Sequence, residues 1–166
     1  QPQQVLFRNL KQREEALAES EARLKLALDA GRMGTFDWAM DENRVDWSEG
    51  HYRLLGYRPG ELEPSIDAFR TRLHPDDRER HESILQQAIE NRTEYVGDFR
   101  VVWPDGSVHW LEGRGQFVHD PDDRPVRMYG VLTDITLRKE LEEERQNLLE
   151  AARAARTEAE RLNRMK

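Results

Sequence analysis

The sequence contains no cysteine. Without a thiol the chain can form no disulfide, no thiolate zinc site and no cysteine nucleophile. The other side chains supply no nucleophile beside a general base, no glycine-rich phosphate loop and no histidine set at metal-ligand spacing. The composition therefore argues against an enzyme and against a metal site within these residues.

Long hydrophobic runs are also missing. No apolar stretch approaches the roughly 18 residues that a membrane-spanning helix needs, and no secretory signal peptide is apparent. We therefore expect a cytoplasmic chain that makes no membrane contact itself. A longer parent protein could still be anchored in a membrane through spans outside this chain.

Hydrophobic residues make up only 37% of the chain, and charged residues make up 36%. Residues 31–136 hold 13 basic and 21 acidic side chains, whereas residues 1–30 and 137–166 are almost balanced in charge. An acidic middle segment repels phosphate backbones, and it has no basic stripe interleaved with aromatics. We therefore expect no nucleic-acid partner. The balanced ends are typical of solvated helices.

The first segment, residues 1–31, predicts an amphipathic helix over residues 4–30. Leu10, Leu17 and Leu24 recur every seven residues, which is the spacing of a coiled-coil seam. Gly31 is expected to end the helix.

The middle segment, residues 32–136, predicts an α+β domain. Two short alternating stretches precede a helical middle part, and three longer alternating stretches follow it. Pro75, with Asp76 and Asp77 after it, is expected to begin a helix that reaches about Asn91, because both carboxylates favour a helix N-terminus. This order of elements predicts an antiparallel sheet with helices on one face.

The last segment, residues 137–166, predicts one long helix with Thr136 as its N-cap residue. Its apolar residues follow alternating steps of four and three, and Glu144 and Glu158 occupy two places of the same seam. A helix of this length spans roughly 45 Å, and nothing else in the chain is large enough to cover it. We expect a homodimer through the flanking helices, with a seam that includes Leu10, Leu17, Leu24, Leu137, Leu141, Leu148 and Leu162.

Six short stretches of the middle segment occur in an order and spacing typical of one family. They are Gly34 to Trp38, Asp46 to Ser48, Leu54 to Tyr57, His74 to Arg78, Asp105 to Ser107 with Trp110, and Gly130 to Thr136. Together they resemble the PAS family with its C-terminal PAC motif, over about residues 24–138.

The resemblance implies a PAS fold, with a five-stranded antiparallel sheet of order 2-1-5-4-3. It also implies a sensing or dimerising role without catalysis. Asp134, Ile135 and Thr136 match the motif that couples the last strand to an output helix. Trp47 and Trp110 are further relay candidates, because in the family the outer sheet face often meets the flanking helices or a second subunit. The favoured interpretation of the large strand aromatics is that they pack the sheet or lie at a dimer surface. Residues 160–166 resemble the stretch before the phosphoacceptor helix of sensor histidine kinases, which suggests a parent protein in a two-component system.

A ligand cavity, if the domain has one, is expected between the sheet and the helices. The candidate lining residues are Leu54, Leu55, Phe69, Leu73, Leu85, Ile89, Phe99, Val101 and Leu111. Each is equally suited to a closed core, and a domain of this size favours complete filling by side chains.

No cofactor is expected. His81 stands at the position where haem-binding members of the family place their iron ligand, but a structural histidine at a charged helix start is the favoured interpretation. The absence of cysteine excludes light-driven bond formation to flavin and leaves only non-covalent flavin binding open.

The combined prediction is a non-catalytic sensor and relay module that dimerises and passes a signal through its last helix to a covalently attached output domain. A histidine kinase is the expected output, and a diguanylate cyclase is the alternative. A ligand-binding chemosensor and a purely structural dimerisation spacer also remain open.

Overall fold

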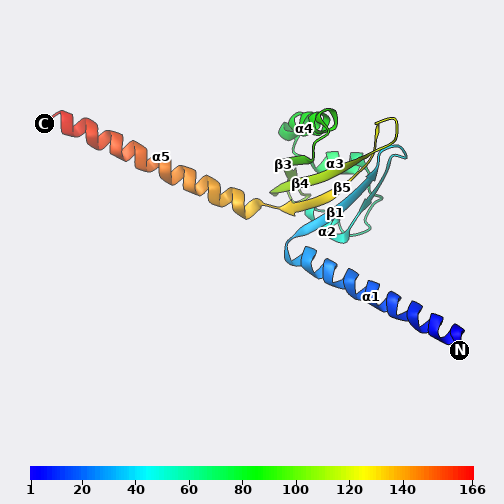
Figure 1. Ribbon diagram of the computed structural model, residues 1–166. Helices are drawn as coiled ribbons and strands as arrows, with labels where there is room; N and C mark the ends of the chain where they lie inside the picture. The colour runs from blue at the N-terminus through cyan, green and yellow to red at the C-terminus, as the bar shows by residue number, and fades with distance from the viewer.

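The computed structural model describes all of residues 1–166 (Figure 1). The elements are, in chain order, α1 (Pro2–Ala30), β1 (Met33–Ala39), β2 (Arg44–Trp47), α2 (Glu49–Leu54), α3 (Ile66–Arg72), the 3₁₀ turn η1 (Pro75–Asp77), α4 (Arg78–Asn91), β3 (Tyr95–Val102), β4 (Val108–His119), β5 (Pro125–Asp134) and α5 (Thr136–Arg164).

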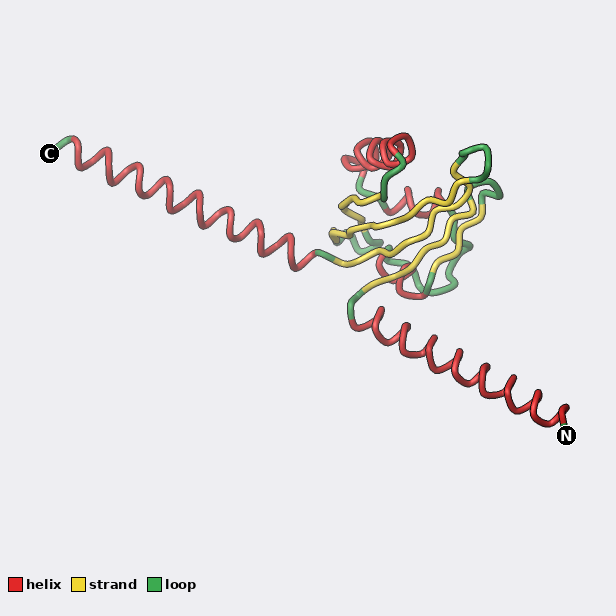
Figure 2. Tube along the Cα trace, viewed as in Figure 1, coloured by secondary structure: helices red, strands yellow, loops and turns green.

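The five strands form one antiparallel sheet in the order β2-β1-β5-β4-β3. This confirms the α+β fold and the strand order that the resemblance implied. The helices α2, α3 and α4 lie on one face of the sheet, and the long helices α1 and α5 extend away from the domain in different directions (Figure 2). The sheet therefore has an inner face toward the short helices and an outer face without a helix over it.

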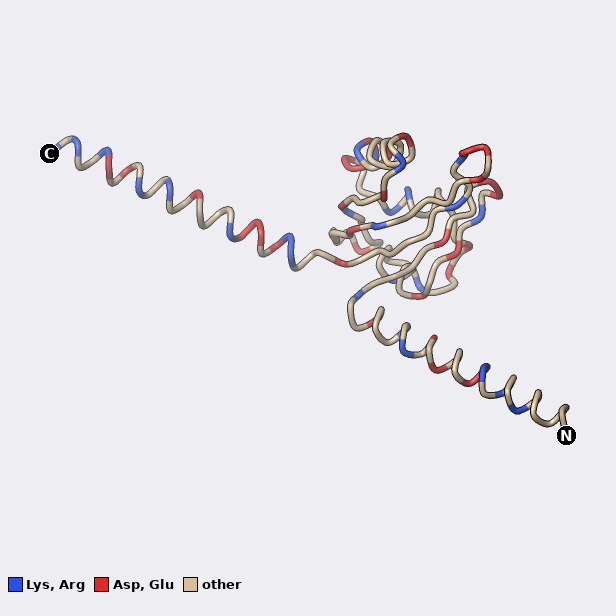
Figure 3. Tube along the Cα trace, viewed as in Figure 1, with Lys and Arg blue, Asp and Glu red and all other residues tan.

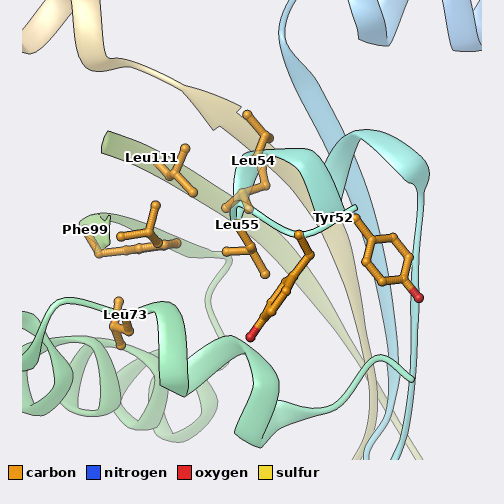
Figure 4. Close-up of a cluster of buried hydrophobic side chains, with 9 residues drawn as sticks. Tyr52, Leu54, Leu55, Leu73, Phe99 and Leu111 are labelled. Atoms are coloured by element: carbon orange, nitrogen blue, oxygen red, sulfur yellow. The ribbon is translucent and has the colours of Figure 1, made fainter. Parts of the chain in front are cut away.

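The principal core joins α2 and α3 to the inner faces of β3, β4 and β5. Its fully buried members include Leu55, Leu73, Phe99, Leu111 and Leu132 (Figure 4). Alternation places them on one face: along β3, Tyr95, Gly97, Phe99 and Val101 are buried and the residues between them are not.

A glycine brings α2 close to β1. A Cβ atom at Gly34 would lie 2.3 Å from the backbone nitrogen of His51, so any other residue would push the helix away. Ser48 begins α2, because its hydroxyl accepts hydrogen bonds from the backbone N–H groups of His51 and Thr35. This local arrangement holds the His51 side chain against the sheet, where it is 3% exposed.

The two long helices bury none of their side chains. The seam leucines of α5 are exposed, from 50% at Leu162 to 67% at Leu137, and basic and acidic residues alternate along both helices (Figure 3). No helix is long and apolar enough to cross a membrane.

The start of α5 differs from the expected N-cap. Thr136 is the first residue of the helix, and Ile135 occupies the cap position without a side-chain hydrogen bond. The carboxylate of Asp134 accepts the Thr136 N–H instead, at 2.9 Å. Asp134 therefore stabilises the first turn, which leaves the Thr136 hydroxyl available for another partner.

Candidate ligand cavity and relay junction

A cavity of about 380 Å³ lies between the inner sheet face and the helices α3 and α4. Its wall includes six aromatic side chains from the sheet and α3: Phe36, Trp38, Trp47, Phe69, Tyr95 and Phe99. The core is thus not closed throughout, contrary to the favoured expectation.

The sequence-derived candidates divide between this cavity and the packed core. Phe69, Leu85 and Phe99 line the cavity. Most of the others, namely Leu54, Leu55, Leu73, Val101 and Leu111, belong to the core cluster, where they contact one another. Ile89 is partly buried on α4 and is not part of the cavity wall.

His51 closes one end of the cavity from α2. Its imidazole stacks on Trp47, with ring centroids 4.7 Å apart, and meets Phe36 edge-on at 5.9 Å. Burial lowers the pKa of His51 to about 3, so the ring is neutral at physiological pH. Sequence reasoning missed this residue, because a lone histidine three residues after a helix cap carries no sign of burial.

His81 faces the cavity from α4. Its ring centroid lies 5.2 Å from the rings of Phe69 and Phe99 and 5.7 Å from that of Tyr95. Burial lowers its pKa to about 4, and Arg70 and Arg80 act in the same direction against Glu82. His81 and these three rings form one aromatic cluster beside the cavity.

No three or more His, Asp or Glu side chains gather closely enough to hold a metal ion.

Trp47 lies on the inner face of the sheet, where it packs against the core as the favoured interpretation of the strand aromatics expects. It pairs with Phe36 across β1 and β2, and it packs against Tyr52 and Tyr57 as well as His51. The reason is the register of β2, in which Trp47 shares a face with the buried Val45. A relay role on the outer face is therefore not available to it.

Trp110 lies at the junction between the sheet and α5. Its backbone N–H donates to the Thr136 hydroxyl at 3.0 Å, and its carbonyl accepts the Ile135 N–H at 2.9 Å. The N–H of Asp134 donates to the carbonyl of Arg32, in the turn between α1 and β1. These bonds place the end of α1 and the start of α5 next to each other, where β1 begins and β5 ends.

A second set of contacts links α5 to α4 across the edge strand β3. Lys139 on α5 contacts the Asp98 carboxylate at 2.8 Å, and Arg80 on α4 contacts the same carboxylate at 3.2 Å. The ammonium of Lys139 also lies 4.7 Å from the centre of the Trp110 ring. The hydrogen bond from Lys139 is the main reason that the pKa of Asp98 is below its ordinary value. Asp98 thus joins the helix that bounds the cavity to the helix that leaves the domain.

The start of α4 is held to the same strand by a buried ion pair. The Asp77 side chain is 5% exposed, and its carboxylate accepts both Arg100 guanidinium bonds, at 2.6 and 3.0 Å, and the Arg100 backbone N–H at 2.8 Å. Arg80, one turn along α4, lies 3.7 Å away. The hydrogen bond from Arg100 lowers the pKa of Asp77, so the pair is ionised at neutral pH.

The strand order, the cavity on the inner face and a helix that starts where β5 ends together define a sensory-type α+β domain. The model of the PAS fold family matches residues 44–132, and the chain belongs to the PAS family. A solved structure of a sensory box histidine kinase/response regulator from Burkholderia thailandensis is 30% identical, with a TM-score of 0.69 over 80% of this chain and 98% of that one.

Two curated relatives come from different signalling systems. The sensor protein FixL of Bradyrhizobium diazoefficiens is 30% identical over 71% of this chain and 23% of the relative. The probable diguanylate cyclase DgcE of Escherichia coli is 25% identical over 81% of this chain and 12% of the relative. The chain thus spans less than a quarter of the length of either protein. It is a PAS sensor domain of the kind found in histidine kinases and diguanylate cyclases, and this fold is typically non-catalytic.

Proposed function

We propose that this chain is a sensor and relay module that dimerises through its flanking helices and transmits a signal along α5 to an output domain. The observation that carries the proposal is the double attachment of α5, through Thr136 to Trp110 and through Lys139 to Asp98. A shift of α4 or of β3 changes the position of Asp98, and Lys139 then moves with it. Two arrangements of α5 whose free energies differ by a few kcal/mol are enough for a switch.

A histidine kinase is the proposed output, which the similarity to the sensory box histidine kinase/response regulator from Burkholderia thailandensis supports. A diguanylate cyclase is the alternative, supported by the similarity to DgcE. In either case the parent protein would be an enzyme and this part of it would not. The sequence that follows Lys166 in the parent protein distinguishes the two outputs directly.

A second candidate function, ligand sensing, is favoured by the cavity of about 380 Å³ between the sheet and α4. Because His81 lies in the cavity wall and Arg80 binds Asp98, a ligand that moves α4 would reach α5 through adjacent residues. Sensing and relay are then two parts of one mechanism.

The relay is tested by replacing Asp98 with Ala in a chimera that carries this chain in place of the PAS domain of a sensor histidine kinase. We expect the basal autophosphorylation rate to change at least fivefold, because α5 loses its link to α4. The Glu160→Ala variant is the matched control, since Glu160 lies far along α5 and contacts only Arg156. If Asp98→Ala and Asp134→Ala both behave like Glu160→Ala, the chain is a dimerisation spacer and not a relay.

The proposed coiled coil is tested at the two acidic seam positions of α5. Replacing Glu144 and Glu158 by Leu removes charge from the seam and adds apolar area, so we expect the dimer dissociation constant to fall at least tenfold. Sedimentation equilibrium measures the dimer dissociation constant. A control that replaces Glu143 and Glu160, which point away from the seam, adds the same two leucines. Equal effects of the two pairs would contradict the assigned seam.

A further inference from the structure

Three buried polar atoms in the cavity wall have no hydrogen-bond partner. They are Nε1 of Trp38, Nδ1 of His51 and the hydroxyl of Tyr95. All three residues line the same cavity, on β1, α2 and β3 respectively. A buried donor without a partner loses its hydration without compensation, so such atoms are rare in folded proteins and their clustering in one wall points to a missing partner.

A pair of glycines lies directly beside the Tyr95 ring. Gly97 and Gly113 face each other across β3 and β4. A Cβ atom at Gly113 would lie 3.0 Å from Cε1 of Tyr95, and one at Gly97 would lie 3.1 Å from its hydroxyl oxygen. Larger side chains at these positions would displace the phenol. The glycines thus make room for a hydroxyl that is buried beside the cavity.

The chemistry of these atoms limits what can pair with them. An indole N–H only donates, and a phenol that has no other partner is able to donate. Burial raises the pKa of Tyr95 above its ordinary value, so the hydroxyl keeps its proton. His51 is neutral, and its Nδ1 donates or accepts according to the tautomer. The partner must therefore offer hydrogen-bond acceptors to Trp38 and Tyr95.

The cavity wall also limits the charge and shape of the partner. The charged residues that line it, Asp67, Arg70 and Glu82, are exposed, and Arg70 and Glu82 form an ion pair of 2.8 Å with each other. No charged side chain lies in the interior to compensate a buried ion. The aromatic wall favours flat rings, and a volume of about 380 Å³ is near the lower end of small-molecule sites.

We propose that the cavity binds an uncharged aromatic compound of one or two rings that carries a carbonyl-type acceptor, and that Trp38 and Tyr95 donate hydrogen bonds to it. This inference rests on the second proposed function, ligand sensing, and adds the chemical class of the ligand. Neither donor residue is needed for the relay between Asp98 and Lys139.

Three matched two-ring probes test the class of ligand: coumarin, which is neutral with a carbonyl acceptor, naphthalene, which has no acceptor, and 1-naphthoate, which is an anion. Binding to the full chain is measured by isothermal titration calorimetry and by shifts of backbone amide signals in ¹H–¹⁵N spectra. We expect coumarin to bind at least tenfold more tightly than either of the others, and the shifted signals to come from residues around the cavity.

Two conservative variants test the donors. Trp38→Phe and Tyr95→Phe each remove one donor and keep a ring, so each is expected to weaken coumarin binding about five- to tenfold and to leave naphthalene binding unchanged. Trp110→Phe and Tyr129→Phe, on the outer sheet face, are the matched controls. They should change neither the affinity for coumarin nor the affinity for naphthalene. If one of the two variants Trp38→Phe and Tyr95→Phe does not fold, the other alone tests the donor assignment.

Different outcomes overturn different parts of the proposal. Tightest binding of 1-naphthoate would keep ligand sensing and reject the neutral class. Equal affinity for coumarin and naphthalene, or an unchanged coumarin affinity in Tyr95→Phe, would reject the donor assignment. No shifts with any of the three probes, in a chain whose spectrum shows a folded domain, would reject both this inference and ligand sensing at the cavity.

Discussion

At pH 5 the domain is expected to be about 3 kcal/mol less stable than at pH 7, because two buried histidines must take up protons when it unfolds. Burial lowers the pKa of His51 to about 3 and that of His81 to about 4, from 6.5 in the unfolded chain. Between pH 6.5 and pH 4 the unfolded state therefore binds more protons than the folded state. Its free energy falls relative to the folded state as the pH decreases.

The pH range from 6.5 to 4 separates the effect of the histidines on stability from the effect of the carboxylates. Asp77 and Asp98 have lowered pKa values in the folded state, so their contribution to stability is present above their unfolded pKa of about 3.8 and is lost at lower pH. A loss between pH 7 and pH 5 must come chiefly from groups whose unfolded pKa lies near 6.5. His51 and His81 contribute about equally in this range, since the folded-state pKa of each lies below 5.

Chemical denaturation at pH 7 and pH 5, at one protein concentration, measures the effect. His51→Phe and His81→Phe are each expected to reduce the difference between the two pH values by about 1–2 kcal/mol, because phenylalanine has no proton to bind. Leu111→Ala is the control, since Leu111 belongs to the principal core cluster, which contains neither histidine and no group that titrates in this range. It should lower stability equally at both pH values. A double histidine variant with an unchanged pH dependence would show that other groups titrate on unfolding.

The fold was predictable because its signals are local and periodic. Alternation along Tyr95, Phe99 and Val101 marks the inner face of β3 from the sequence alone, and the tight turn at Gly106 pairs that strand with β4. The strand order came from the resemblance to the PAS family. A strand of four residues carries a weaker periodic signal, so the sequence did not decide on which face of the sheet Trp47 lies.

The cavity was not predictable from the same patterns. Alternation predicts that Trp38 and Tyr95 lie on the inner face of the sheet, but it does not predict whether side chains fill the space between that face and the helices. That depends on how the rings of Phe69, His81 and Phe99 meet, which only coordinates provide. Most of the leucines that the sequence offered as pocket candidates, namely Leu54, Leu55, Leu73 and Leu111, pack instead into the principal core cluster.

The contact between Asp98 and Lys139 escaped prediction for a related reason. The chain is rich in charged residues, and most of its ion pairs are exposed and carry little energy. Nothing in the sequence distinguishes Asp98 from the other acidic residues of the middle segment. Asp77 was interpreted as a helix N-terminal carboxylate, whereas its principal partner is Arg100 on β3.

Replacing Asp77 with Ala is expected to lower the free energy of unfolding by about 3 kcal/mol, because it leaves the guanidinium and the backbone N–H of Arg100 without their acceptor. Thermal unfolding followed by circular dichroism measures the loss, together with urea denaturation. The neighbouring carboxylate of Asp76 is the matched control. Its side chain is 78% exposed, so Asp76→Ala should cost less than about 0.5 kcal/mol.

The double variant Asp77→Ala with Arg100→Met separates the cost of the unpaired charge from the value of the pair. Removing both partners takes the uncompensated guanidinium away, so we expect the double variant to be more stable than Asp77→Ala alone. A double variant less stable than Asp77→Ala would mean that Arg100 contributes mainly through other contacts, such as its position 5.5 Å from the Trp110 ring.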